Sequence, residues 1–222
     1  QLDFRPIHEP AGRSRRRGAR LDRAFVESLD RRLPDVGGTR SAAVLLSIRR
    51  ALSAVGCAGE GTVPVGVPVS LRDDPDLERT TGMFLNTIPV PVDDAASIPE
   101  VLARFRECRR RRGVPYDRIV RGATNSPMHA NGRPPWLDLV VGMTESDRRP
   151  ESPLSWRVAP SGDVPFPAFV MVDFGRDGCR IELDVDPLVV DADTADRLLA
   201  AFVDGLRRLA RDEPTGSAAS RV

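Results

Sequence analysis

The chain has 222 residues, enough for one large domain with a sizeable core, and its 41% apolar and 29% charged residues are typical of a globular protein. The net charge of +1 argues against nucleic-acid binding by bulk charge, and all 33 basic residues are arginines. No apolar run approaches the roughly 20 residues that a membrane-spanning helix needs, and no signal-peptide pattern follows the polar start. We therefore expect a cytoplasmic protein with neither nucleic acid nor membrane as a partner.

Three cysteines, Cys57, Cys108 and Cys179, lie far apart in the chain. They form no Cys-x-x-Cys pair and leave an odd thiol, so the sequence suggests neither a disulfide framework nor a zinc site. Unpaired cysteine usually behaves as a small buried apolar residue. We predict three structural thiols and no metal site.

The first 20 residues are rich in proline, glycine and arginine, which predicts a flexible linker over 1–20. An acidic partner is the alternative interpretation of its arginine run. Apolar residues at helical spacing predict a helix over 21–33, ended by Pro34 and two glycines. A second, buried helix is predicted over 39–55, with Thr39 as its N-cap.

Two apolar strands are predicted over 63–71 and 87–92. Pro64 and Pro68 have no N–H for a ladder, so we expect a bulge or a local sheet edge in the first strand.

Ser97, followed three residues later by Glu100, has the pattern of a capping box and predicts the start of another helix. That helix ends in Arg109, Arg110, Arg111 and Arg112. Cations in a last turn complement the helix dipole, so this cluster has an adequate structural reason.

The rest of the chain predicts further strands and a closing helix. In order these are a short helix from 114, a loop over 123–135, strands over 137–144, 154–158, 166–174 and 179–185, a helix over 193–211 and a disordered tail over 215–222. Gly-Arg-Asp-Gly at 175–178 indicates a hairpin between the last two strands. The order of elements predicts an α/β fold in which a mixed β-sheet packs with helices.

Two motifs at a fixed distance are the most specific signal in the chain. Val-Gly-Val-Pro-Val-Ser-Leu-Arg occupies 65–72, and Gly-Met-Phe-Leu-Asn-Thr occupies 82–87. Together with Gly-Val-Pro-Tyr-Asp at 113–117 and the closing strand, helix and proline, they resemble the second half of the condensation domains of nonribosomal peptide synthetases. The related epimerisation domains carry a different motif in place of the second one, so the resemblance favours condensation.

The resemblance implies a chloramphenicol acetyltransferase-like half-domain, the C-terminal subdomain, over 21–214. In that family the catalytic histidine belongs to an HHxxxDG motif in the preceding, N-terminal subdomain, and this chain has no His-His pair. We interpret its two histidines, His8 and His129, as exposed bystanders; the alternative is that His129 is a substitute base. No catalytic residue is assigned.

The resemblance also implies which residues meet the substrate tunnel or the subdomain interface: Arg72, Gly82, Phe84, Asn86 and Thr87. For Arg72, an ion pair with Asp73, Asp74 or a carboxylate across the interface is expected. For Asn86 and Thr87, a structural role is favoured slightly over substrate contact. The Arg109–Arg112 cluster has contact with an acidic carrier protein as its alternative role.

Two hypotheses for function stay open. The first is a C-terminal condensation half that supports amide-bond formation between carrier-bound thioester and amine substrates, inactive without its N-terminal half. The resemblance implies that no cofactor is bound directly, because the substrates are attached to the phosphopantetheine of carrier proteins. The second is a non-catalytic scaffold that binds carrier proteins or neighbouring domains. Either way, an apolar inner wall predicts a homodimer or heterodimer. An acyltransferase that uses CoA thioesters is a third, less favoured reading.

Overall fold

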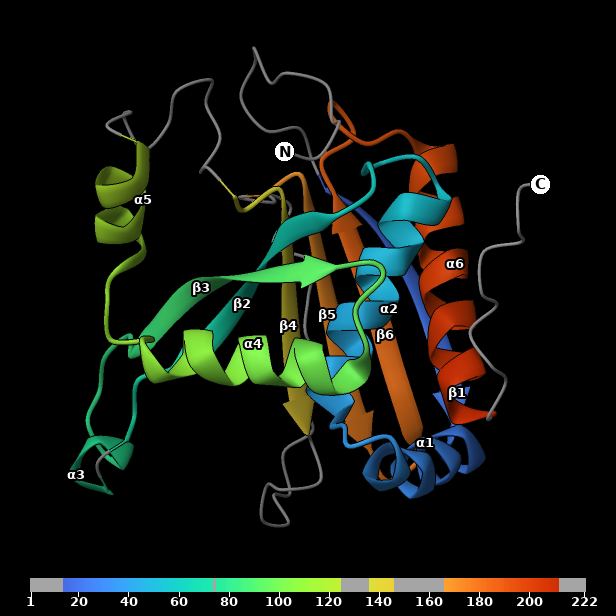
Figure 1. The fold of residues 1–222 in the computed structure, drawn as a ribbon, viewed down its shortest axis with the longest axis horizontal. Helices are drawn as coiled ribbons and strands as arrows, with labels where there is room; N and C mark the ends of the chain where they lie inside the picture. The colour runs from blue at the N-terminus through green and yellow to red at the C-terminus, as the bar shows by residue number, and fades with distance from the viewer. Residues whose placement is uncertain (1–13, 74, 125–135, 146–165, 212–222) are drawn as a thin grey trace.

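The computed structural model describes residues 14–73, 75–124, 136–145 and 166–211. Six strands form one mixed sheet in the order β1-β6-β5-β4-β2-β3, and α2, α4 and α6 lie across one of its faces (Figure 1). The strands are β1 (Arg15–Asp22), β2 (Thr62–Ser70), β3 (Leu85–Asp93), β4 (Leu139–Glu145), β5 (Ala168–Gly175) and β6 (Gly178–Val185). The helices are α1 (Arg23–Asp35), α2 (Arg40–Ala54), α3 (Pro75–Glu78), α4 (Ile98–Arg110), α5 (Tyr116–Thr124) and α6 (Ala192–Ala210). The predicted α/β fold, a mixed sheet packed with helices, is confirmed.

A single core fills the space between the sheet and these helices. Alternate residues of the strands, such as Val65, Val90, Val170 and Ile181, are buried on the helix side and pack against α2 and α6. Helix α2 is buried on nearly every side, as its alanine- and leucine-rich sequence predicts. Among the described residues, no helix has the combination of length and hydropathy that a membrane-spanning segment requires.

The predicted hairpin between β5 and β6 is confirmed. The strands pair from Ala168↔Val185 to Gly175↔Gly178, so two residues form the turn. Gly178 has a φ of +130°, and a Cβ there would lie 2.1 Å from the carbonyl oxygen of Leu21. Only glycine fits where the turn meets the end of β1.

The prediction of a linker over residues 1–20 is wrong for its last part. Residues 15–22 form β1, which pairs antiparallel with β6 over its whole length. Arg16 binds Glu182 and Asp184 at 3.0 and 2.7 Å, and Arg17 binds Asp196 at 2.5 Å. The arginine run has the composition of a solvated linker. Its neutralising carboxylates lie about 170 residues further along the chain, so the sequence around the run gives no sign of them. Residues 1–13 lie outside the described part.

The prolines of β2 cause no bulge. The register with β3 is continuous, and it places Pro64 opposite Pro91 and Gly66 opposite Pro89. Two prolines cannot exchange ladder hydrogen bonds, so these must be non-hydrogen-bonded pairs, in which backbone groups point away from the partner strand. On the side of β2 away from β3, the neighbouring strand is β4, and the two pair only at Gly66. Strand β3 itself is the outer edge of the sheet. The alternative expectation, a local edge, therefore fits the structure.

The helix signals at both termini of α2 and α4 are confirmed within a residue or two. The Thr39 hydroxyl accepts a hydrogen bond from the N–H of Ala42, and the Glu100 carboxylate accepts one from the N–H of Ser97 at 2.8 Å. The three cysteines form no disulfide, and burial raises the pKa of the Cys179 thiol to about 12. The predicted strand over 154–158 and tail over 215–222 lie outside the described residues.

Candidate functional site

Residues 71–84 run from the end of the first motif into the second and form a projecting segment, which we call the arm. It carries α3 at the lower left of Figure 1. Arg72 holds the arm together. Its guanidinium lies 4.4 Å from the centre of the Phe84 ring and donates hydrogen bonds to the carbonyl oxygens of Thr80 (2.9 Å), Gly82 (3.1 Å) and Leu77. One side chain at a strand end therefore organises the backbone of the whole segment.

The expected ion pair of Arg72 with Asp73 is wrong. Asp73 instead pairs with Arg112, at the end of α4. The three carbonyl oxygens and the ring already occupy the Arg72 guanidinium, and the arm turns Asp73 towards α4. Asp74 lies outside the described residues.

Gly82 allows the arm to close over Phe84. A Cβ at Gly82 would lie 3.0 Å from the Phe84 ring, and the residue has a φ of +153°. The residues next to it, where the arm joins β3, are apolar and exposed: Met83 is 88% exposed and Leu85 is 59% exposed. Two exposed apolar side chains this close together in the chain are candidates for contact with a partner.

Asn86 and Thr87 point to opposite faces of the sheet. Asn86 lies on the helix side, where its Nδ2 donates to the carbonyl oxygens of Arg112 (2.7 Å) and Val114 (2.8 Å) and so fixes the connection between α4 and α5. Thr87, one residue on, faces the other way, and its side chain has no hydrogen bond within the described residues. The structural role favoured for Asn86 matches this geometry, while Thr87 is free for a contact.

The four arginines at the end of α4 are not equivalent. Arg110 and Arg111 both pair with Glu107 on the same helix. Arg112 reaches across to Asp73 and is half-buried. Arg109 is exposed, and its side chain has no partner among the described residues. Only part of the cluster is therefore available to an acidic partner.

The second face of the sheet, turned away from α2, α4 and α6, carries Thr87 and the prolines of β2 and β3. The register of β4, β5 and β6 adds Phe169 and Met171, both half-buried, beside the Arg16 ion pairs. Gly142 leaves room there, because a Cβ would lie 3.0 Å from Met171 Cε. This face is apolar in its middle and charged towards β1.

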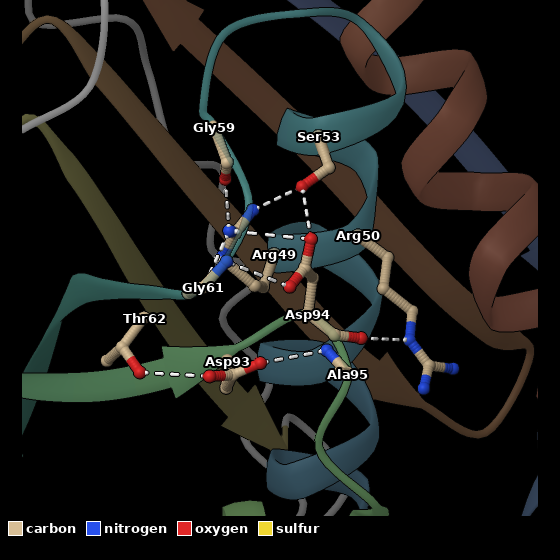
Figure 2. A network of polar contacts seen from close by, with 9 residues as sticks. All are labelled: Arg49, Arg50, Ser53, Gly59, Gly61, Thr62, Asp93, Asp94 and Ala95. Atoms are coloured by element: carbon tan, nitrogen blue, oxygen red, sulfur yellow. Dashed lines mark hydrogen bonds and ion pairs between the residues drawn. The ribbon is translucent and has the colours of Figure 1, made fainter.

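A buried polar network lies away from the arm, where α2 ends and β3 meets the next turn (Figure 2). Arg49 is 0% exposed and donates to the carbonyl oxygens of Gly59 (2.6 Å) and Gly61 (2.7 Å) and to the Ser53 hydroxyl (2.5 Å). Asp94 lies 3.6 Å from Arg49 and accepts hydrogen bonds from Ser53 (2.9 Å) and the Gly61 N–H (3.3 Å). Sequence reasoning missed this network, although an arginine inside an alanine- and leucine-rich helix was a signal for it.

The electrostatics of this network favour a charged Asp94. Burial alone raises the pKa of its carboxyl group, but hydrogen bonds from Ser53 and Gly61 and the charge of Arg49 outweigh that effect. The net pKa lies below the ordinary value of 3.8. The network ties the start of β2 to the end of β3, so its role is to hold the base of the hairpin that carries the arm.

We find no group of three or more potential metal ligands among the described residues. His8 and His129 lie outside them, so their predicted bystander role stays a prediction. The described side chains of the arm and of the first residues of β3 include the Arg72 cation, the Phe84 ring and the Asn86 amide. This arrangement can position and bind a partner.

No protein-family model matches the chain. In sequence it is 31% identical over 112 residues to the "Probable non-canonical nonribosomal peptide synthetase (NRPS) CymA" of Salinispora arenicola (47% of this chain, 1% of that protein). It is 30% identical over 155 residues to the phosphinothricin tripeptide synthetase PhsB of Streptomyces viridochromogenes (65% of this chain, 13% of that protein). The chain therefore spans only a small part of the relatives it matches.

The fold is similar to solved condensation-type domains. The X-domain in its complex with OxyB from teicoplanin biosynthesis gives a TM-score of 0.79 at 21% identity, over 96% of this chain and 49% of that one. The condensation domain of the Monacolin K polyketide synthase MokA gives 0.77 at 12% identity, over 93% and 50%. The epimerization domain from the third module of tyrocidine synthetase B gives 0.66 at 16% identity, over 95% and 51%.

These comparisons define the class of protein: the chain has the chloramphenicol acetyltransferase-like fold of condensation-type domains and corresponds in extent to one half of such a domain. The sequence matches are to nonribosomal peptide synthetases, as the two motifs predicted.

Proposed function

We propose that this chain is the C-terminal half of a nonribosomal peptide synthetase condensation domain. It supports amide-bond formation between carrier-bound substrates in the cytoplasm once an N-terminal half with the HHxxxDG motif joins it. The observation that carries this proposal is the arm: Arg72 of the first motif contacts Phe84 of the second, and the apolar side chains of Met83 and Leu85 beside that contact are exposed. The coverage of 49% of the X-domain chain and 50% of the MokA condensation-domain chain supports it as well.

In this proposal the chain's own residues position the substrates and exclude water. The arm and Thr87 contact the other half, and the second face of the sheet, with Phe169 and Met171, lines the space between the halves. Closing such a space removes water and places an amine near a thioester carbon. This placement lowers a large part of the activation barrier for acyl transfer. The base comes from the other half. Carrier proteins bring the substrates on phosphopantetheine, with the exposed Arg109 among their contacts.

The test is to combine the purified chain with candidate N-terminal halves and two loaded carrier proteins, and to follow dipeptidyl-carrier formation by mass spectrometry. We expect product only from the combination, and a loss of complex formation in a Met83→Ser/Leu85→Ser variant. An Arg118→Ser/Val114→Ser variant, also at exposed positions outside the arm, is the matched control. A stable complex that makes no product, or product from this chain alone, would refute the proposal.

The second candidate is a non-catalytic scaffold. One observation favours it: a domain of the same fold, the teicoplanin X-domain, was solved in a complex with another protein, OxyB. A stable complex with a neighbouring domain or a carrier protein, combined with absence of product under every pairing of halves, is the outcome that selects this candidate.

A further inference from the structure

The described residues of the arm contain no buried side chain. From Asp73 to Met83, every residue whose side chain is described is exposed, except for the half-buried Leu77. Helix α3, which the arm carries, stands apart from α4 and from the sheet (Figure 1). Burial against a core is what usually holds a segment in place, so for the arm polar contacts have to take over that role.

The contacts inside the arm fix its shape. The Arg72 guanidinium binds carbonyl oxygens of the arm and lies against the Phe84 ring. The N–H of Leu71 donates a hydrogen bond of 2.8 Å to the carbonyl oxygen of Phe84, which closes the base of the segment. All of these partners belong to the arm itself. They therefore hold it together as one unit, but they do not set its direction relative to the rest of the protein.

An ion pair ties the arm to α4. The Asp73 carboxylate pairs with Nη2 of Arg112, just beyond the end of that helix. Arg112 is itself fixed: its Nη1 donates to the carbonyl oxygen of Arg109 at 3.0 Å, and its own carbonyl oxygen accepts from Asn86 Nδ2 at 2.7 Å. The Arg112 side chain is 24% exposed and that of Asp73 is 61% exposed. The cation is thus held by the body of the protein, and the carboxylate is the partner that can leave.

The other arginines at the end of α4 do not reach the arm. Arg110 and Arg111 pair with Glu107 on the same helix. The helix dipole favours cations at this end of α4, but it gives no reason for one of them to pair with a separate segment. The contact of Arg112 with the arm therefore needs an explanation of its own.

We propose that the Asp73–Arg112 pair is a latch that sets the direction of the arm relative to α4, while Arg72 sets the shape of the arm. With the latch closed, Met83 is presented in one position. With the latch open, the arm moves as a unit about the ends of β2 and β3. Presenting a contact residue in one position lowers the entropic cost of binding a partner. The latch is a property of this chain alone and does not depend on which partner the arm contacts.

The test measures the distance between spin labels on the arm and on α4, by electron paramagnetic resonance on the whole chain. The labels are attached at Arg79→Cys and Ala103→Cys, both exposed, with Cys108→Ser as background because the other two cysteines are buried. We expect a narrow distance distribution, and in Asp73→Asn a shift of about 2- to 5-fold towards a second, open population, the size that an exposed ion pair supports. The matched control is Glu107→Gln, which breaks ion pairs at the same end of α4 and should leave the distribution narrow.

Further measurements separate the direction of the arm from its shape. A label pair within the arm, at Arg79→Cys and Met83→Cys, should keep its distance in Asp73→Asn and lose it in Arg72→Gln. Arg112→Gln should match Asp73→Asn, and the double variant should add nothing, because each change removes the same interaction. Added salt should broaden the arm-to-α4 distribution of the wild type, since Asp73 is exposed. Circular dichroism checks that every variant folds.

Three outcomes would overturn the proposal. A distribution in Asp73→Asn as narrow as in the wild type would show that the pair does not direct the arm. Equal broadening in Glu107→Gln would reduce the effect to the loss of any ion pair at the end of α4. Broadening of the label pair within the arm in Asp73→Asn would mean that the segment loses its shape, so that there is no unit to hold. All three are measured on the chain alone, so they are distinguishable from a failure of the partner contact proposed above.

Discussion

Replacing Asp94 by asparagine is expected to destabilise the protein far more than the same change at its neighbour Asp93. Both carboxylates accept two hydrogen bonds: Asp94 from Ser53 and Gly61, and Asp93 from Thr62 (3.1 Å) and Ala95 (3.0 Å). Only Asp94 faces a buried cation, as Figure 2 shows. The pair of variants therefore separates the loss of the charge from the loss of ordinary hydrogen bonds.

The magnitude follows from the surroundings of Arg49. Removing one partner of a buried ion pair typically costs about 3–5 kcal/mol, because the other charge is left uncompensated. Here Asp94 is 21% exposed, the N–O distance is 3.6 Å, and Arg49 keeps its carbonyl acceptors. We therefore expect Asp94→Asn to lower the free energy of unfolding by about 2–3 kcal/mol, and Asp93→Asn by about 0.5–1 kcal/mol.

Urea unfolding followed by circular dichroism at pH 7 measures both values. For a chain of this size the larger one corresponds to a fall in melting temperature of about 4–12 °C. Equal effects of the two substitutions would refute the reasoning, since the cation would then contribute nothing.

The pH dependence is an independent check. Because the folded-state pKa of Asp94 lies below its ordinary value of 3.8, the stability that its charge contributes is fully present above that value. It is lost as the pH falls through the folded-state pKa. The difference between wild type and Asp94→Asn should therefore be constant from pH 7 to about 5 and narrow below about 4. A difference that widens in acid would contradict the assignment.

Three further predictions follow from single contacts. Asn86→Asp places a carboxylate against two carbonyl oxygens and should cost about 2 kcal/mol, with faster amide exchange in the connection between α4 and α5; a loss below about 0.5 kcal/mol would exclude the bonding described. Gly66→Ala puts a Cβ 2.7 Å from a neighbouring side chain and should cost about 1–3 kcal/mol by urea unfolding, whereas Gly113→Ala meets nothing within 4 Å and should be neutral. Pro89→Thr/Pro91→Thr restores N–H groups on the outer edge of β3 and should promote self-association in analytical ultracentrifugation; unchanged sedimentation would contradict the register argument.

The arm illustrates how far sequence reasoning reaches into a site. The two motifs identified the segment, and in a strand the period of two means that neighbouring side chains point to opposite faces. This alternation does not indicate which face of the sheet the helices cover. The division of labour between Asn86, which fixes α4 to α5, and Thr87, on the second face, became visible only when β3 was placed against α4.

Ionic partners were the hardest feature to predict. Arg72 was expected to bind an adjacent aspartate and instead binds carbonyl oxygens and a ring, and Arg49 was not singled out at all. Charge interactions depend on distance in space, and in this chain the partners are brought together by strand pairing and helix packing rather than by sequence proximity.

The fold class, the family resemblance and most element boundaries could be predicted from the sequence, because these depend on local properties: apolar periodicity, capping residues and turn glycines. Three features became visible only in the tertiary structure: residues 15–22 are a strand, the prolines of β2 and β3 share one face, and Arg49 and Asp94 belong to one buried polar network. Each of these rests on contacts between segments far apart in the chain, which no local pattern encodes.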